Sequence, residues 1–91
     1  MLAFSEFGRR VGQNASNGTD HGTANNVFLL SGALRKPGLL NAPASLADLD
    51  QGDLRYQLDF RSLYASILTD WLGADASLVL GPGVEKIAGL V

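Results

Sequence analysis

The clearest pattern of apolar and polar positions lies in residues 59–73, which read DFRSLYASILTDWLG. Large apolar residues recur there at intervals of three and four, as along one face of an amphipathic helix. Asp59 is a good N-cap, and Gly73 stands where a left-handed residue commonly ends a helix. We predict a helix over residues 59–72 with one buried and one exposed face. The buried face comprises Phe60, Leu63, Tyr64, Ile67, Leu68, Trp71 and Leu72, and the exposed face comprises Arg61, Ser62, Ser66 and Asp70.

Two shorter apolar runs predict β-strands. Residues 2–4 read LAF and residues 27–31 read VFLLS. Because both runs are apolar throughout, we expect strands that are buried on both faces, as in a parallel sheet. Residues 8–26, between them, hold four glycines and four asparagines and predict a long loop.

The remaining segments predict mostly irregular structure. Residues 33–56 contain the turn sequence KPG and scattered leucines, and we expect a packed loop with a short helical turn near residues 45–48. Asp75 is a candidate N-cap for a second short helical turn, ASLVL. The tail KIAGLV is either a final strand or a docked extension.

Two to three strands and one long amphipathic helix place the chain in the α/β class. Strands that are apolar throughout need neighbours on both sides and cover on both faces. The 91 residues cannot supply these layers. We therefore expect residues 1–91 to form a single partial domain, which is a piece of a larger α/β sheet or is completed by a partner.

Composition and charge exclude several classes of function. The net charge is −2, and the chain has no basic cluster beyond Arg9 and Arg10, which argues against a nucleic-acid-binding surface. Cysteine is absent, so neither a disulfide framework nor a thiolate metal site is possible. No apolar run approaches the roughly 20 residues that span a bilayer.

Three polar residues border the predicted strands and suggest a metal site. Glu6 follows the first strand, and Asp20 and His21, the only histidine, precede the second. If the strands are parallel neighbours, Glu6 lies at a carboxyl end, the usual position of a site in an open α/β sheet. A carboxylate and an imidazole suit a divalent ion such as zinc, which Asp20 could bind directly or through orienting His21. Alternatively, His21 holds the loop through a hydrogen bond to a carbonyl.

Arg9 and Arg10 suggest an anion site beside that metal. A guanidinium offers a planar fork of donors that matches phosphate or sulfate, so an anionic ester is a candidate ligand. The alternatives are a surface pair of arginines, or an ion pair between one of them and Glu6. No serine or threonine has a recognisable base beside it.

Three segments, in order, resemble a known family: FSEFGRR, NGTDHGTANNVFLLSGAL and SLADLDQGDLRYQLDFRSLYASILTDWLG. They cover roughly residues 2–81 and resemble the C-terminal part of a bacterial family of unknown function, sulfatase-like, within the alkaline phosphatase superfamily. The resemblance implies an incomplete C-terminal piece of an alkaline-phosphatase-like sheet-and-helix domain. It also implies export to the periplasm for the full-length protein.

The resemblance assigns roles to individual residues. Glu6 stands where a short acidic motif supplies a metal ligand, although Phe7 replaces the histidine that usually follows. His21 stands where a histidine before a buried strand binds the second metal. The nucleophile and the remaining ligands lie upstream in the family. The resemblance thus implies a fragment of a metal-dependent hydrolase of phosphate or sulfate esters, which is inactive without the missing N-terminal part of its domain. The alternative is a non-catalytic module, truncated or completed by a partner.

Overall fold

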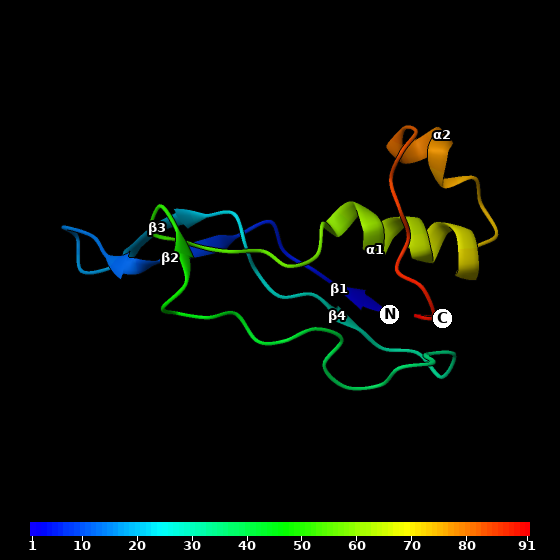
Figure 1. Cartoon of the computed structure of the whole chain (residues 1–91), viewed down its shortest axis with the longest axis horizontal. Coiled ribbons are helices and arrows are strands. Elements are labelled where there is room, and N and C mark those ends of the chain that lie inside the picture. The colour runs from blue at the N-terminus through cyan, green and yellow to red at the C-terminus, as the bar shows by residue number, and fades with distance from the viewer. The chain divides into compact units, whose positions relative to one another are not determined.

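The computed structural model describes residues 1–91 and divides into two compact units. Unit 1 comprises residues 1–30 and 41–57, and unit 2 comprises residues 31–40 and 58–91. All the strands lie in unit 1, as three antiparallel pairs, and all the helices lie in unit 2 (Figure 1). The chain is therefore mixed α/β, with small antiparallel sheets.

The two predicted strands are neighbours, but they are antiparallel. Strand β1 (Leu2–Ala3) pairs with β4 (Phe28–Leu29). The amino group of Met1 donates to the Leu30 carbonyl at 2.8 Å, and the Leu30 N–H donates to the Met1 carbonyl at 2.8 Å. Parallel strands need a crossover, which is usually a helix, and the residues between β1 and β4 form no helix.

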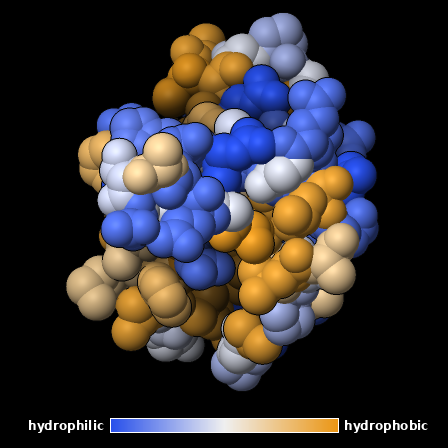
Figure 2. All heavy atoms as spheres, turned by 90° about the vertical axis from the view of Figure 1, so that its left-hand side faces the viewer, coloured by the Kyte–Doolittle hydropathy of each residue, from blue (hydrophilic) through white to orange (hydrophobic).

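The prediction that these strands are buried on both faces is wrong within this chain. Phe28 is 64% exposed and Leu30 is 52% exposed. The reason is that β1 and β4 form a sheet of only two strands, with no further strand on either edge. Figure 2 shows another face of the molecule, on which orange apolar spheres also lie at the surface among blue polar ones.

The predicted loop of residues 8–26 contains a β-hairpin instead. Strand β2 (Gly8–Gln13) pairs antiparallel with β3 (Thr19–Gly22), with a register shift between Arg9 and Gln13. The Asn14 side chain shapes the connecting turn, because its Oδ1 accepts from the N–H groups of Ser16 at 2.9 Å and Gly18 at 3.0 Å. The strands are mostly polar, so they lack the apolar alternation that would have predicted them.

A second hairpin replaces the irregular structure predicted before residue 56. Strands β5 (Leu49–Asp50) and β6 (Asp53–Leu54) are joined by Gln51 and Gly52, whose φ angles are +50° and +85°. Two positive φ angles are the requirement of a type I′ hairpin turn. The predicted helical turn near residues 45–48 is wrong: the Ser45 hydroxyl accepts from two following N–H groups and forms a bend.

In unit 2 the predicted long helix is confirmed. Helix α1 (Phe60–Ser66) continues into a π-helical turn, η1 (Ile67–Trp71). Asp59 is the N-cap, and its carboxylate accepts from the Arg61 N–H at 2.9 Å. Gly73 has a φ of +64° and ends the helix as predicted.

The buried face of this helix differs from the predicted one. Ser66, assigned to the polar face, is fully buried at 0% exposure beside the buried Ala65, whereas Phe60 is 60% exposed and Leu72 is 65% exposed. The Ile87 N–H donates to the Ser66 Oγ at 2.7 Å, so the C-terminal tail lies against the small residues of the helix. Small side chains permit this close approach. The buried positions of the helix are therefore those that the tail contacts, and not those of the predicted apolar face.

The tail is a docked extension and not a strand. It follows α2 (Ala76–Leu80), which is capped as predicted by the Asp75 carboxylate accepting from the Ser77 N–H at 3.0 Å. Leu90 is buried, and its carbonyl accepts from the Arg35 N–H at 3.0 Å. None of the helices has the length and apolarity that crossing a membrane requires.

The Ser66 contact yields a first prediction. The hydroxyl also lies 3.0 Å from the Ser62 carbonyl, to which it can donate. Replacing Ser66→Ala leaves the Ile87 N–H without its partner, at a cost of about 1–3 kcal/mol for an unsatisfied buried donor. Hydrogen exchange at the Ile87 amide should accelerate by at least about tenfold. The exposed Thr69→Ala change is the control, and equal exchange in both variants would contradict the assigned face.

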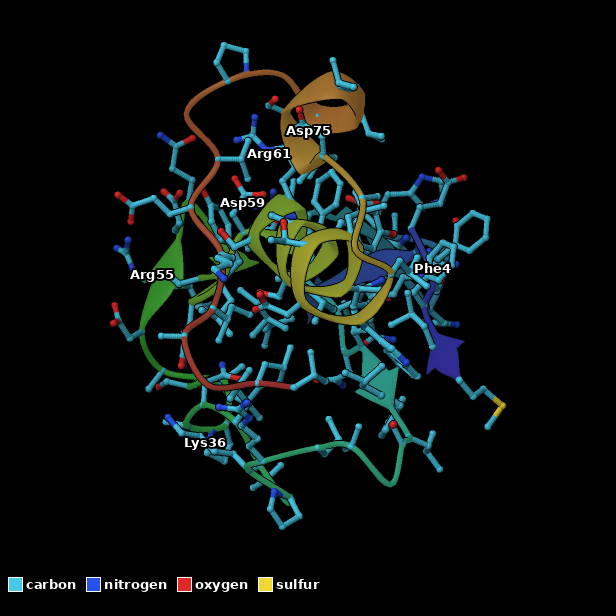
Figure 3. All side chains as sticks on the ribbon, turned by 90° about the vertical axis from the view of Figure 1, so that its right-hand side faces the viewer. Phe4, Lys36, Arg55, Asp59, Arg61 and Asp75 are labelled. Carbon is cyan, nitrogen blue, oxygen red and sulfur yellow. The ribbon has the colours of Figure 1, made fainter.

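The N-cap of α1 yields a second prediction, on pH. Hydrogen bonds from the Arg61 side chain and its backbone N–H lower the pKa of Asp59 from 3.8 to about 2 (Figure 3). Because the folded pKa is depressed, this stabilisation is present above pH 3.8 and is lost as the pH falls towards 2. The Arg61 amide shift in NMR spectra should titrate in that range. The Asp59→Asn variant keeps the cap acceptor and should abolish the titration; an unchanged titration would assign it to another group.

Candidate functional site

The β2–β3 hairpin brings two of the predicted site residues together. Arg9 lies directly opposite His21 in the register. Side chains of directly opposite residues share one face of an antiparallel pair, with Cβ atoms about 4.5–5.5 Å apart. Asp20 precedes His21 in the same strand, and successive side chains point to opposite faces. The hairpin therefore pairs a guanidinium with an imidazole and directs Asp20 away from both.

The side chains of Arg9 and Asp20 make hydrogen bonds within the chain, whereas the side chain of His21 does not. Arg9 Nη1 donates to the Thr19 carbonyl at 2.7 Å, which steadies the guanidinium beside the turn. The Asp20 carboxylate accepts from the Asn14 side-chain amide at 3.0 Å and so belongs to the turn. The His21 side chain is exposed and makes no hydrogen bond within the chain. The alternative in which His21 holds the loop through a carbonyl therefore finds no support here.

Glu6 lies outside both strands of this hairpin. Its backbone carbonyl accepts from the Gly8 N–H at 3.2 Å, and its exposed carboxylate pairs with neither Arg9 nor Arg10. No three histidine, aspartate or glutamate side chains of the chain lie together in a group that could hold a metal ion. The assignment of Glu6, Asp20 and His21 as ligands stays a prediction that requires further ligands.

Arg10 contacts the second hairpin of unit 1. Its Nη2 donates to the Gln51 carbonyl, and the guanidinium lies beside Gly52 so closely that a Cβ there would collide with it. Gly52 thus serves both the positive φ of the turn and the approach of Arg10. The anion-binding role of Arg10 stays a prediction. In this structure the Arg10 side chain joins the two hairpins of unit 1.

Asp53 joins the β5–β6 hairpin to the end of β3. Its Oδ2 accepts from the Thr23 N–H at 3.1 Å and from the Thr23 hydroxyl at 3.2 Å. Its Oδ1 is buried without a hydrogen-bond partner. A Cβ on Gly22 would lie 2.6 Å from this oxygen and 2.8 Å from the backbone carbonyl carbon of Arg9, so a side chain there would force one of them to move.

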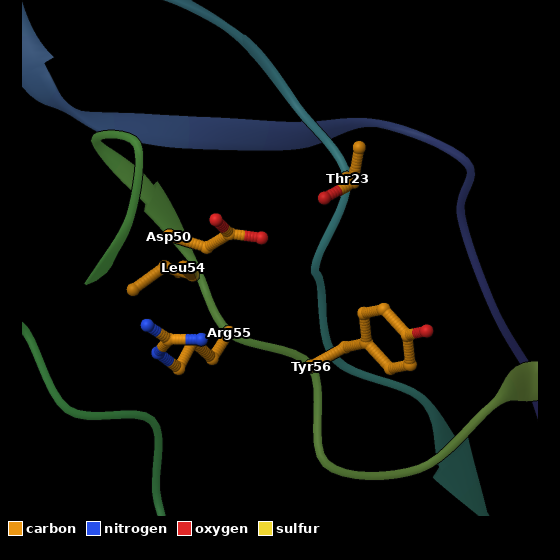
Figure 4. Close-up of a pocket in the computed structure, with 5 residues that line it drawn as sticks. All are labelled: Thr23, Asp50, Leu54, Arg55 and Tyr56. Carbon is orange, nitrogen blue, oxygen red and sulfur yellow. The ribbon is translucent and has the colours of Figure 1, made fainter. Parts of the chain in front are cut away.

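A pocket lies beside this junction, within unit 1. Its volume is about 340 Å³, and Thr23, Asp50, Leu54, Arg55 and Tyr56 line it (Figure 4). It is open to solvent on one side and mixes polar and apolar walls. Its lining combines a carboxylate, a guanidinium, two hydroxyls and an aromatic ring with one leucine side chain.

The sequence prediction missed every residue of this pocket. Asp50 and Asp53 flank a two-residue turn, and a glycine in such a turn between leucines is a hairpin signal. Recognising it would have placed the two carboxylates opposite each other. The contact between Asp53 and Thr23 joins residues 30 positions apart in the chain, and no local sequence pattern predicts it.

Gly22 provides the prediction that tests this junction. A Gly22→Ala change places a methyl group against Asp53 and should break its bond to the Thr23 N–H, accelerating hydrogen exchange there by at least about tenfold. Gly12→Ala is a matched control, because Gly12 lies in the same hairpin and a Cβ there meets nothing within 4 Å. Equal hydrogen exchange at the Thr23 amide in both variants would contradict the assigned contact between Asp53 and Thr23.

Comparison with known proteins adds no identification. No family model, curated protein or solved structure matches the chain. The resemblance of residues 2–81 to the sulfatase-like family therefore stays a prediction from three sequence segments.

Proposed function

We propose that this chain is the C-terminal part of a larger α/β domain of the alkaline phosphatase superfamily. The complete protein would be a metal-dependent hydrolase of phosphate or sulfate esters, and this chain alone would not be a catalyst. The proposal rests on the three segments of sequence resemblance and on the surface that each unit leaves open.

The observation that carries the proposal is the exposure of large apolar side chains. In both units these residues are exposed, although large apolar residues are among those most often buried in folded domains. Burying one such side chain contributes about 1.5–3 kcal/mol, so covering even several of them would change stability decisively. The exposed residues in unit 1 include Met1, Phe4, Phe7, Phe28, Leu30 and Leu46, and those in unit 2 include Leu39, Phe60, Trp71, Leu72, Leu78 and Val79.

The pairing of Arg9 with His21 supports the hydrolase interpretation. An exposed imidazole without an internal partner is available as a ligand to a divalent ion. A guanidinium on the same face of the hairpin would suit the anionic oxygens of an ester. A bound metal would polarise those oxygens. The further ligands and the nucleophile would have to come from the rest of the domain.

A second candidate is a non-catalytic module that a partner completes. The open edges of the β1–β4 pair favour it, because Leu2 and Leu29 face each other between two hydrogen-bonded pairs. In an antiparallel ladder the N–H and C=O groups of such residues point outward, where another strand can pair with them. The two candidates differ in whether His21 binds a metal.

The first experiment tests catalysis. The chain alone, assayed with aryl phosphate and aryl sulfate esters in the presence of zinc, manganese or calcium, should give no more turnover than its His21→Ala variant. The reason is that it holds neither a nucleophile with a base nor a group of metal ligands. Turnover well above the variant would contradict the claim that the chain is inactive alone.

A second experiment separates the two candidates. Zinc added to the chain should shift the NMR signals of the His21 ring and of Arg9 across the pair, weakly because few ligands are present. His21→Ala should abolish the shift, whereas Asn26→Ala, a polar change outside β3, should not. A chain whose His21 signals ignore zinc would contradict the role of His21 as a ligand and favour the non-catalytic module.

A further inference from the structure

We infer that the pocket of unit 1 lined by Thr23, Asp50, Leu54, Arg55 and Tyr56 binds a small organic cation, an alkylammonium group. This site is separate from the proposed ester site, because it shares no residue with the predicted ligands Glu6, Asp20 and His21 or with Arg9 and Arg10. It does not depend on the proposed function.

The charges of the pocket select a cation. Arg55 already has partners, since its Nε contacts the Asp48 carboxylate at 3.0 Å and its Nη2 donates to the Leu49 carbonyl at 3.3 Å. The Asp50 carboxylate has no hydrogen bond or ion pair. Figure 4 shows it directed towards Thr23, whereas the Arg55 guanidinium points away from Thr23 and Tyr56. The free charge of the pocket is therefore one carboxylate.

The remaining walls suit the apolar part of such a ligand. The face of a tyrosine ring attracts a cation within about 6 Å, and the methyl groups of an alkylammonium also pack on an aromatic surface. Tyr56 presents an exposed ring, and Leu54 supplies an aliphatic wall. A volume of about 340 Å³ admits a group of the size of choline and lies at the small end of ligand pockets.

The backbone holds these groups in place. Asp50 and Leu54 belong to the strands of the β5–β6 hairpin, and the type I′ turn fixes their register. Thr23 is tied to the same hairpin through Asp53. Three walls thus come from paired backbone, which lowers the entropic cost of binding.

The test uses choline and its neutral isostere 3,3-dimethylbutanol as probes. In nitrogen-edited NMR spectra of the whole chain, choline should shift the amides of Asp50, Leu54 and Tyr56 saturably at millimolar concentration, and the neutral isostere should not. Asp50→Asn should weaken choline binding by about threefold to fivefold, because a partly exposed pair of charges contributes about that much to the affinity. Tyr56→Leu should weaken it to a similar extent.

Glu85→Gln is the control, because it removes an exposed carboxylate from unit 2 and should leave the affinity unchanged. Three outcomes would overturn the proposal: equal shifts with the neutral isostere, no saturable shift, or an unchanged affinity in Asp50→Asn. Undispersed signals from residues 49–56 would also overturn it, since the pocket requires the hairpin. None of these outcomes depends on the response of His21 to zinc, so this test and the test of the proposed function are independent.

Discussion

Burial of apolar surface is the constraint on which this structure depends, because the chain achieves so little of it. Among its apolar side chains only Ala65 and Leu90 are buried. In most folded domains, hydrophobic burial is the largest favourable contribution offsetting the conformational entropy lost on folding. Each unit therefore relies on hydrogen-bonded contacts that are individually worth about 1 kcal/mol. The open apolar surface and the small two-stranded sheets both follow from this limited burial.

The polar contacts that remain are few and geometrically strict. In unit 1, Asp53 bonds to Thr23 beside Gly22, where a Cβ would collide with the Asp53 carboxylate. In unit 2, the tail reaches the helix only where Ala65 and Ser66 are small enough to admit it. Each contact fixes the position of one segment against another within its unit, but it buries little apolar area.

The sequence predicted those features that a few neighbouring residues determine. Asp59, Gly73 and Asp75 act through the nearest N–H groups or through their own φ angles, and all three have the predicted role. The hairpins escaped prediction because their strands are polar or very short, and because the register of β2 with β3 shifts along the pair. The burial of Ser66 and the opposition of Arg9 to His21 depend on what the folded chain places against them. No helical or strand period encodes such a contact.

The most direct test of this account is the cooperativity of unfolding of the isolated chain, followed through Trp71 fluorescence and far-ultraviolet circular dichroism in urea. A structure with almost no buried core should unfold over a broad range of urea, with transitions that differ between the two probes. A single sharp transition of the monomer, coincident for both probes and extrapolating to about 5 kcal/mol or more, would contradict it. Such stability would mean that the 91 residues complete their own domain.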